Sequence, residues 1–175
     1  MNEQRSPFEE IYSRPGHLIR RLQQIGVAIF KEEAAAHDLT PVQYATLLAI
    51  RLVPGIDNAR LADVVALDRS NIGDVVIRLE KRGLVARRST PQDRRLKLIT
   101  VTPEGDALLD AVEAAVDRTQ ERILAPLRPA QRRQFTEMLK RVVNLNNEHS
   151  RAPLKLDAWR NDRLSRSAVR GHRAE

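Results

Sequence analysis

Residues 58–102 have the sequence NARLADVVALDRSNIGDVVIRLEKRGLVARRSTPQDRRLKLITVT, and this stretch decides the fold. The spacing of its apolar and turn-forming residues predicts a short helix, a break, a second helix ended by Gly83, a strand, a basic loop and a returning strand. These elements span residues 58–65, 66–68, 69–82, 84–88, 89–95 and 96–101. Two helices joined by a tight turn and followed by a two-stranded wing are typical of a winged helix-turn-helix, which binds DNA.

Positive charge is concentrated in two segments of the chain. Between Arg69 and Lys97, nine Lys and Arg residues stand against three acids, and residues 151–175 hold seven against three. The whole chain of 175 residues has a net charge of +7, so the remaining residues are net acidic. Such concentration is expected when one face meets a polyanion, here double-stranded DNA. Residues 151–175 are predicted to form a basic C-terminal tail.

The predicted helices before and after this unit are long and amphipathic. Residues 1–14 are polar and predicted to be flexible, and the helix predicted over 17–37 is apolar on two of its surfaces. Two more long helices are predicted between residues 103 and 147. Because no other domain covers their apolar faces, we expect helices 17–37 and 103–147 to build a homodimer interface. The fold class is therefore mainly α with a small β-wing.

Two helix starts carry the same local signal. Thr40, Pro41 and Gln43 supply an N-cap, a proline at the first helical position and the second half of a capping box. Thr102 and Pro103 repeat the Thr-Pro start after the wing. The DNA-binding core is thus predicted to extend from residue 40 to residue 102.

Composition excludes several classes of protein. The chain has no cysteine, so disulfides, thiolate metal sites and thiol nucleophiles are excluded. Its four histidines lack metalloprotease spacing, and no glycine-rich phosphate loop is present, so we predict no enzyme, no metal and no cofactor. Without a signal peptide or a run of roughly 18 apolar residues, the protein is expected to be cytoplasmic, with no membrane contact.

The second helix of the motif has two different faces. Ile72, Val75, Val76 and Leu79 recur at helical spacing and should pack on the preceding helix. The other face, predicted to contact DNA, consists of Arg69, Ser70, Asn71, Asp74 and Arg78, with Asp68 as the N-cap. Asn71 suits adenine and Arg78 suits guanine or phosphate, whereas Asp74 repels phosphate and could instead orient Arg78. An ordinary solvated helix face is the alternative.

The loop of the wing is rich in polar and basic residues. Asp93, Arg94 and Arg95 are adjacent, so the carboxylate can hold one arginine while the other enters a minor groove. A basic hairpin without a ligand is the alternative.

Together these segments resemble the signature of the MarR family of bacterial transcriptional regulators. The resemblance covers about residues 15–148 and rests on LEKRGLV at 79–85, Asp93-x-Arg95 and VTxxG at 101–105. It implies a homodimer with intertwined terminal helices, a palindromic operator, repression, and release by a small, often aromatic molecule. It also implies that Ser70, Asn71 and Arg78 contact the major groove, that Arg95 contacts the minor groove, and that Asp93 braces the wing. Gly73 and Asp74 depart from the family's usual hydroxyl and basic residues, which argues against base contact by Asp74.

The first long helix resembles a narrower subgroup. GHLIRRLQQ at residues 16–24 is similar to regulators of the catabolism of aromatic acids, such as benzoate, and of their coenzyme A thioesters. On this hypothesis His17, Arg20 and Arg21 hold an acidic effector and Tyr44 forms a wall of its site. A solvated helix start is the alternative for the three basic residues. For the whole protein, the alternative is a winged-helix adaptor that contacts other proteins without specific DNA binding.

Overall fold

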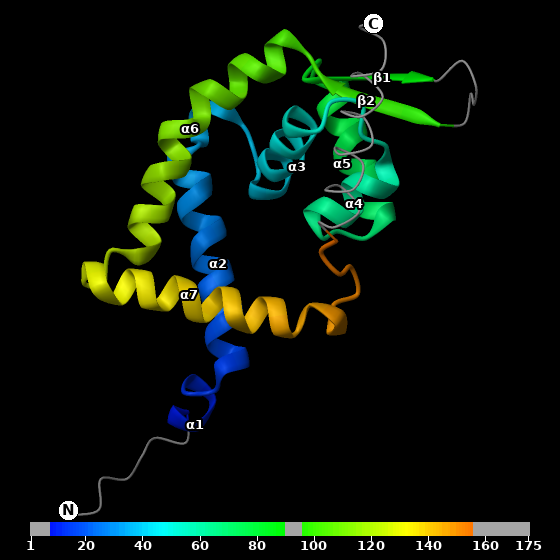
Figure 1. Cartoon of the computed structure of the whole chain (residues 1–175). Coiled ribbons are helices and arrows are strands. Elements are labelled where there is room, and N and C mark those ends of the chain that lie inside the picture. Colours follow the sequence, from blue (N-terminus) through cyan, green and yellow to red (C-terminus); the bar gives the residue numbers. More distant parts are fainter. Residues whose placement is uncertain (1–7, 90–95, 156–175) are drawn as a thin grey trace, which may run out of the picture.

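The computed structural model describes residues 8–89 and 96–155 (Figure 1). These residues form helices and one two-stranded antiparallel sheet, which confirms the winged helix-turn-helix class. The elements are α1 (Glu9–Tyr12), α2 (Pro15–Glu33), α3 (Pro41–Leu52), α4 (Asn58–Val65), α5 (Arg69–Lys81), β1 (Val85–Ser89), β2 (Lys97–Val101), α6 (Pro103–Leu124) and α7 (Pro129–Leu145). Short 3-10 turns follow α2 at Ala35–His37 and α7 at Asn147–His149. The segment predicted to be flexible, 1–14, thus contains the one-turn helix α1.

Helices α3, α4 and α5 share one apolar core with the wing. Its fully buried side chains include Leu47, Ile50, Leu61, Ile72, Val76, Leu79 and Ile99. The predicted inner face of α5 is confirmed, because all four of its residues are buried. The β1–β2 ladder runs from Val85 opposite Val101 to Ser89 opposite Lys97. Backbone hydrogen bonds of 2.9 Å from Gly55 to Ile99 and from Ile99 to Ile56 attach β2 to the loop after α3.

The helix starts predicted at Thr40 and Thr102 are confirmed. The Thr40 hydroxyl accepts the Gln43 N–H at 3.2 Å, and the Gln43 side-chain oxygen accepts the Thr40 N–H at 2.9 Å, which completes the capping box. The Thr102 hydroxyl accepts the Gly105 N–H at 3.1 Å. Local side-chain chemistry therefore sets where α3 and α6 begin.

Aspartates stand at the N-cap positions of both α4 and α5, but only the first makes capping hydrogen bonds. Asp57 caps α4 by accepting the N–H groups of Ala59 and Arg60, at 2.8 and 3.0 Å. Asp68 stands at the N-cap position of α5, but its side chain makes no capping hydrogen bond. Its carboxylate lies 3.0 Å from the Arg151 guanidinium instead. Asp68 is therefore the N-cap residue, as predicted, but its carboxylate pairs with an arginine from the distant C-terminal segment and makes no capping hydrogen bond.

Helix α6 starts in direct contact with the wing. A Cβ at Gly105 would lie 2.2 Å from the Leu84 carbonyl oxygen and 2.9 Å from Cγ1 of Val101. The Thr102 hydroxyl donates to the Gly83 carbonyl at 2.7 Å, and the Thr102 N–H donates to the Leu84 carbonyl at 3.1 Å. The VTxxG motif thus marks the point where the start of α6 touches the backbone just before β1.

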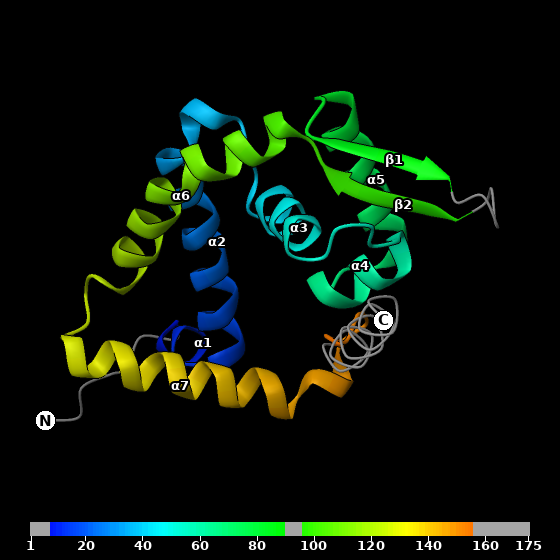
Figure 2. The same ribbon diagram turned by 45° about the horizontal axis from the view of Figure 1, so that its top comes forward.

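Helices α2, α6 and α7 extend away from the DNA-binding unit (Figures 1 and 2). A second core between α2 and α6 consists of Phe30, Ala34, Leu39, Val112 and Ala115. Helix α7 runs back from the far end of α6 toward α4, and none of its residues is buried. Large apolar side chains stay exposed on α1, α2 and α7: Ile11, Tyr12, Leu18, Ile19, Ile25, Val27, Met138, Leu139, Val142, Val143 and Leu145. Among residues 8–89 and 96–155, nothing covers these faces.

Candidate nucleic-acid interface

The outer face of α5 carries the side chains that were predicted to contact DNA. All five are exposed, namely Arg69, Ser70, Asn71, Asp74 and Arg78. They extend along about 14 Å of the helix at 1.5 Å per residue. The first three lie in the first turn, where a recognition helix enters the major groove and where free backbone N–H groups favour phosphate. The helix therefore presents one continuous polar surface on the side opposite its core face.

The proposed orientation of Arg78 by Asp74 is absent from the free protein. Both side chains are exposed, and no ion pair or hydrogen bond joins them within the described residues. Water screens a single exposed pair so well that the attraction rarely repays the ordering of two side chains. Arg78 is thus available to a base or a phosphate.

An ion pair between Arg87 and Glu80 holds the wing against α5. The Nε of Arg87 donates to Oε2 of Glu80 at 2.8 Å, and a second guanidinium nitrogen donates to the same oxygen. These hydrogen bonds lower the pKa of the Glu80 carboxyl and raise the pKa of Arg87. Because its guanidinium is engaged, Arg87 positions the wing, whereas its neighbour Arg88 is exposed. The predicted tip residues, Asp93, Arg94 and Arg95, lie outside the described residues.

Arg82 connects the end of α5 to the turn after α2. Its guanidinium donates to the carbonyl of Asp38 at 2.6 Å and to the carbonyl of His37 at 3.2 Å. The recognition helix is therefore tied to α2 at one end by a charge-assisted contact. A shift of α2 relative to the DNA-binding unit must either move α5 or break this contact.

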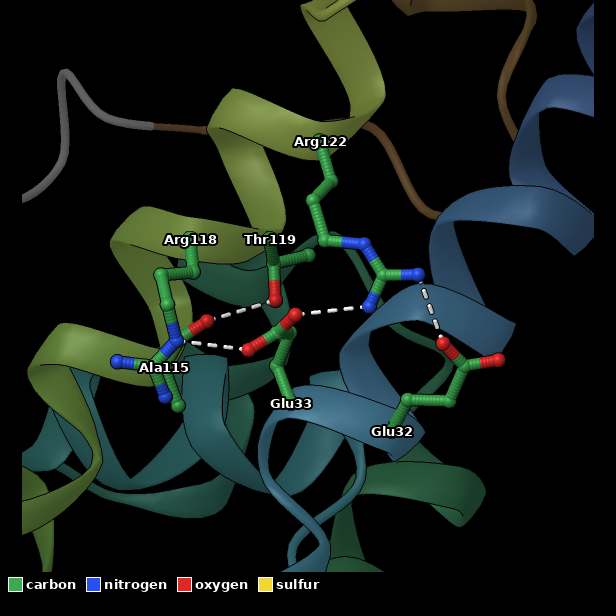
Figure 3. Close-up of polar contacts among 6 residues, drawn as sticks. All are labelled: Glu32, Glu33, Ala115, Arg118, Thr119 and Arg122. Atoms are coloured by element: carbon green, nitrogen blue, oxygen red, sulfur yellow. Dashed lines mark hydrogen bonds and ion pairs between the residues drawn. The ribbon is translucent and has the colours of Figure 1, made fainter.

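Two arginines of α6 form ion pairs with two glutamates of α2 (Figure 3). Arg118 and Arg122 each donate to Glu33 at 2.7 Å, through separate carboxylate oxygens, and Arg122 also donates to Glu32 at 2.8 Å. Hydrogen bonds from Arg118 and then Arg122 lower the pKa of Glu33, while Glu33 and then Glu32 raise the pKa of Arg122. This cluster, together with the second core, fixes the angle between α2 and α6.

Acidification should weaken this α2–α6 cluster. The pKa of Glu33 is lower in the folded protein than its ordinary value of 4.5. Its pairing therefore contributes stability that is complete above the unfolded pKa and is lost as the pH falls through the folded pKa. Urea unfolding of the wild type and of Glu33→Gln measures the effect. We expect the wild type to be more stable at neutral pH and the difference to shrink below about pH 4.5; a pH-independent difference would contradict this.

The basic residues of the predicted ligand site lie at the start of α2. His17 is half-buried, with its ring edge-on to Tyr12 at a centroid distance of 5.2 Å. Its Nε2 is buried and has no hydrogen-bond partner among the described residues. Arg20 and Arg21 are exposed, and each donates to the side-chain oxygen of Gln24 at 3.3 Å. The two arginines thus point a concentrated positive charge toward solvent.

Tyr44 belongs to α3 and packs near the other end of α2, so it does not join these residues within one chain. Its ring centroid is 6.2 Å from that of Phe30, which is thirteen residues beyond His17. Thirteen residues of helix span about 20 Å. Within one chain, Tyr44 is therefore separated from His17, Arg20 and Arg21 by most of the length of α2, and their grouping in one ligand site stays a prediction that requires a second copy.

Tyr44 instead lines an apolar cavity of about 300 Å³ on α3 and α4. The lining residues are Tyr44, Ala45, Leu48, Ala49, Leu52, Val53 and Val64, none of which is charged. Tyr44 also packs against both apolar cores, so the cavity touches their junction. The volume lies at the lower end of the range for small-molecule sites, about 300–1,000 Å³. The cavity can take an aromatic ring, but the acidic group of a ligand must find its partner elsewhere.

The described residues offer no group of three or more His, Asp or Glu side chains that could hold a metal ion. Asp110 of α6 pairs with Arg51 of α3 at 2.7 Å.

In the described part of the chain, no helix combines the length and hydropathy needed to cross a membrane.

Comparison with known proteins places this geometry in a family. The model of the MarR family matches residues 39–97, which include α3, α4, α5 and β1. The HTH-type transcriptional repressor NicR of Pseudomonas putida is 31% identical over 79% of this chain and 87% of its own length. The chain belongs to the MarR family of transcriptional regulators. As a MarR-family regulator it is not an enzyme, as the sequence predicted.

Two solved structures of regulators share the MarR-family fold of this chain. BpsR of Bordetella bronchiseptica, whose DNA binding is regulated by 6-hydroxynicotinic acid, is 31% identical, with a TM-score of 0.69. That match covers 74% of this chain and 93% of BpsR. The transcriptional repressor CouR, bound to a 23-mer DNA duplex, is 27% identical, with a TM-score of 0.73 over 79% of this chain and 98% of CouR.

Sequence reasoning missed the residues that position this MarR-family interface. Glu80 and Arg87 belong to a helix and a strand, and the partners of Arg82 are backbone carbonyls far back in the chain. No spacing rule connects such pairs. The charge count between residues 69 and 97 included both arginines but could not separate structural ones from those left for DNA.

Proposed function

We propose that this protein is a homodimeric repressor that binds a palindromic operator and is released by an acidic aromatic ligand or its coenzyme A thioester. The observation that carries the proposal is the exposed polar face of α5, from Arg69 to Arg78, held in a fixed position against a basic wing. A rigidly positioned helix of this kind fits the depth of a major groove.

In the proposed complex, Ser70, Asn71 and Arg78 contact the major groove, and Arg69 contacts the backbone beside it. At the wing, Arg95 contacts the minor groove, and Asp93 braces the wing by holding the neighbouring Arg94. The presence of the winged unit in CouR, a repressor solved on a DNA duplex, supports this assignment. Asp74 faces the same surface and restricts which bases the helix accepts, because a carboxylate can only accept hydrogen bonds.

The proposed second copy covers the exposed apolar faces of α1, α2 and α7. A helix of 17 residues without a buried side chain, such as α7, gains little from its own chain. Two copies related by a two-fold axis would bury the same face on both sides. They would also present two α5 helices, which fit successive major grooves when their centres are about 34 Å apart.

The proposed effector places its aromatic ring in the Tyr44 cavity. BpsR responds to 6-hydroxynicotinic acid, an aromatic acid, which supports this ligand class. We place His17, Arg20 and Arg21 of the second copy against the acidic group, because their neighbours Leu18 and Ile19 belong to the proposed dimer face. A ligand at Tyr44 lies at the junction of the two cores and so can change the angle that Arg82 transmits to α5. It reduces DNA binding only if it prefers the spacing that does not fit DNA.

Titration calorimetry tests the ligand. Benzoate, 6-hydroxynicotinate and benzoyl-coenzyme A are added to the free protein and to the protein bound to a duplex that it has selected from a random pool. We expect tighter binding to the free protein. Equal affinities, or no binding by any of the three compounds, would contradict the proposal.

Two variants locate the ligand site. Ala45 is exposed and lines the cavity, so Ala45→Phe should fill it without disturbing the core and should remove ligand binding while keeping DNA binding. Ala107→Phe, at an exposed position on α6, is the matched control and should bind both the ligand and DNA. Loss of ligand binding in both variants would argue against the cavity.

A further inference from the structure

The residues that follow α7 are docked on the DNA-binding unit of the same chain. The Arg151 guanidinium lies 3.0 Å from the Asp68 carboxylate, and the Lys155 ammonium lies 3.4 Å from the Asp63 carboxylate. The backbone N–H of Lys155 also donates to the Asp63 carbonyl at 3.0 Å. We call residues 150–155 the C-terminal arm; Figure 2 shows it, in orange, reaching α4. Two separate ion pairs and a backbone hydrogen bond attach it to the helix-turn-helix.

Hydrogen bonds order the C-terminal arm itself and join it to the 3-10 turn that precedes it. The side chain of Asn147 donates to the Leu154 carbonyl at 3.0 Å and accepts the Leu154 N–H at 2.8 Å. The Ser150 hydroxyl accepts the Ala152 N–H at 3.2 Å. Pro153 and Leu154 are half-buried. An asparagine side chain that hydrogen-bonds to both backbone groups of one residue closes the chain into a defined turn. The backbone of the arm therefore has a defined conformation.

The attachment point of the arm borders the predicted DNA-contacting surface. Asp68 immediately precedes Arg69, Ser70 and Asn71, the first turn of the recognition helix. A carboxylate at that place repels the phosphates that flank a major-groove helix, and Arg151 neutralises it. The Arg151 side chain is 88% exposed, whereas that of Asp68 is 30% exposed. Since a guanidinium has five N–H donors, the pair with Asp68 leaves donors for a second acceptor.

We propose that the C-terminal arm is a further DNA-contacting element of this protein, in which Arg151 bridges Asp68 and a backbone phosphate beside the half-site. This inference rests on the proposed DNA-binding function. The wing is attached near the end of α5 through Glu80, and the arm is attached at its start through Asp68. The two elements thus contact the backbone on both flanks of the recognition helix. Lys155 serves as the anchor, because its backbone and its side chain both bind Asp63.

The salt dependence of DNA binding tests the arm directly. Affinity for a random-sequence duplex of about 30 base pairs is measured by fluorescence anisotropy over a range of salt concentrations. Each phosphate contact contributes about 0.9 to the slope of log affinity against log salt, so Arg151→Ala should reduce the slope of a dimer by about 1.8. Between 50 and 200 mM salt, the wild type should therefore lose about twelvefold more affinity than the variant.

Two further variants separate a phosphate contact from a structural or general charge effect. Arg151→Lys keeps a cation at the site and should restore most of the slope. Arg133→Ala removes the same charge from an exposed position on α7 and should leave the slope unchanged. If Arg151 only braced α5, Arg151→Ala would lower affinity by one factor at every salt concentration; that result overturns the proposal. A wild type without salt-dependent duplex binding would instead overturn the proposed function itself.

Discussion

Replacement of Gly105 by alanine should lower the free energy of unfolding by about 3 kcal/mol. The added Cβ would lie 2.2 Å from the Leu84 carbonyl oxygen, a backbone atom that cannot rotate away. The start of α6 would have to move off the wing, which would stretch the two hydrogen bonds that join Thr102 to Gly83 and Leu84. Insertion of a methyl group into a packed site costs about 1–3 kcal/mol, and a clash with backbone belongs at the upper end.

Urea unfolding measures this effect, with Gly73→Ala as the matched control. Gly73 lies within α5, and a Cβ there would meet nothing within 4 Å. The control should be stabilised by about 0.5–1 kcal/mol, because alanine is the better helix former. Equal stability of Gly105→Ala and the wild type would show that α6 does not start in contact with the wing.

A charge in the apolar face of α7 should separate the proposed dimer and abolish tight operator binding. Val142 is 51% exposed and is surrounded by exposed apolar side chains, including Met138, Leu139 and Leu145. In a symmetric interface, Val142→Glu buries two unpaired carboxylates. A monomer holds one half-site only, so the affinity for a selected palindromic duplex should fall at least about 100-fold through lost avidity.

Light scattering at micromolar concentration and anisotropy with the same duplex measure the two effects of Val142→Glu together. Asn144→Glu is the matched control, because residue 144 lies on the opposite face of α7 and is exposed. The control should remain a dimer and should keep its affinity. A stable Val142→Glu dimer, or a wild type that is already monomeric, would contradict the proposed interface.

The elements that were predicted well are those specified by nearby residues. Thr40 with Gln43 gave the start of α3, Thr102 gave the start of α6, and Gly83, with a φ of +72°, ended α5. The buried face of α5 followed from helical periodicity alone. In each case the signal and the structure lie within one or two helical turns of each other, so no tertiary information was needed.

The features that were not predicted depend on residues far apart in the sequence. Asp68 has the chemistry of a helix cap, but Arg151 engages it from 83 positions later. His17 and Tyr44 both suit a ligand, yet His17 lies about 20 Å along α2 from Phe30, the residue beside which the Tyr44 ring packs. The sequence does not predict the cavity at Tyr44, because its other lining residues are aliphatic and resemble ordinary core residues. Tertiary packing decides these features, and the local sequence patterns do not predict it.

Footprinting of the wild-type protein on a duplex selected from a random pool is the most direct test of DNA recognition by a dimer of this chain. We expect two protected half-sites related by a two-fold axis, with centres about 34 Å apart, or roughly ten base pairs. Protection should decrease when an effective aromatic acid is added. A pool that shows no enrichment, as expected for an adaptor, or a single protected half-site would contradict recognition by paired α5 helices.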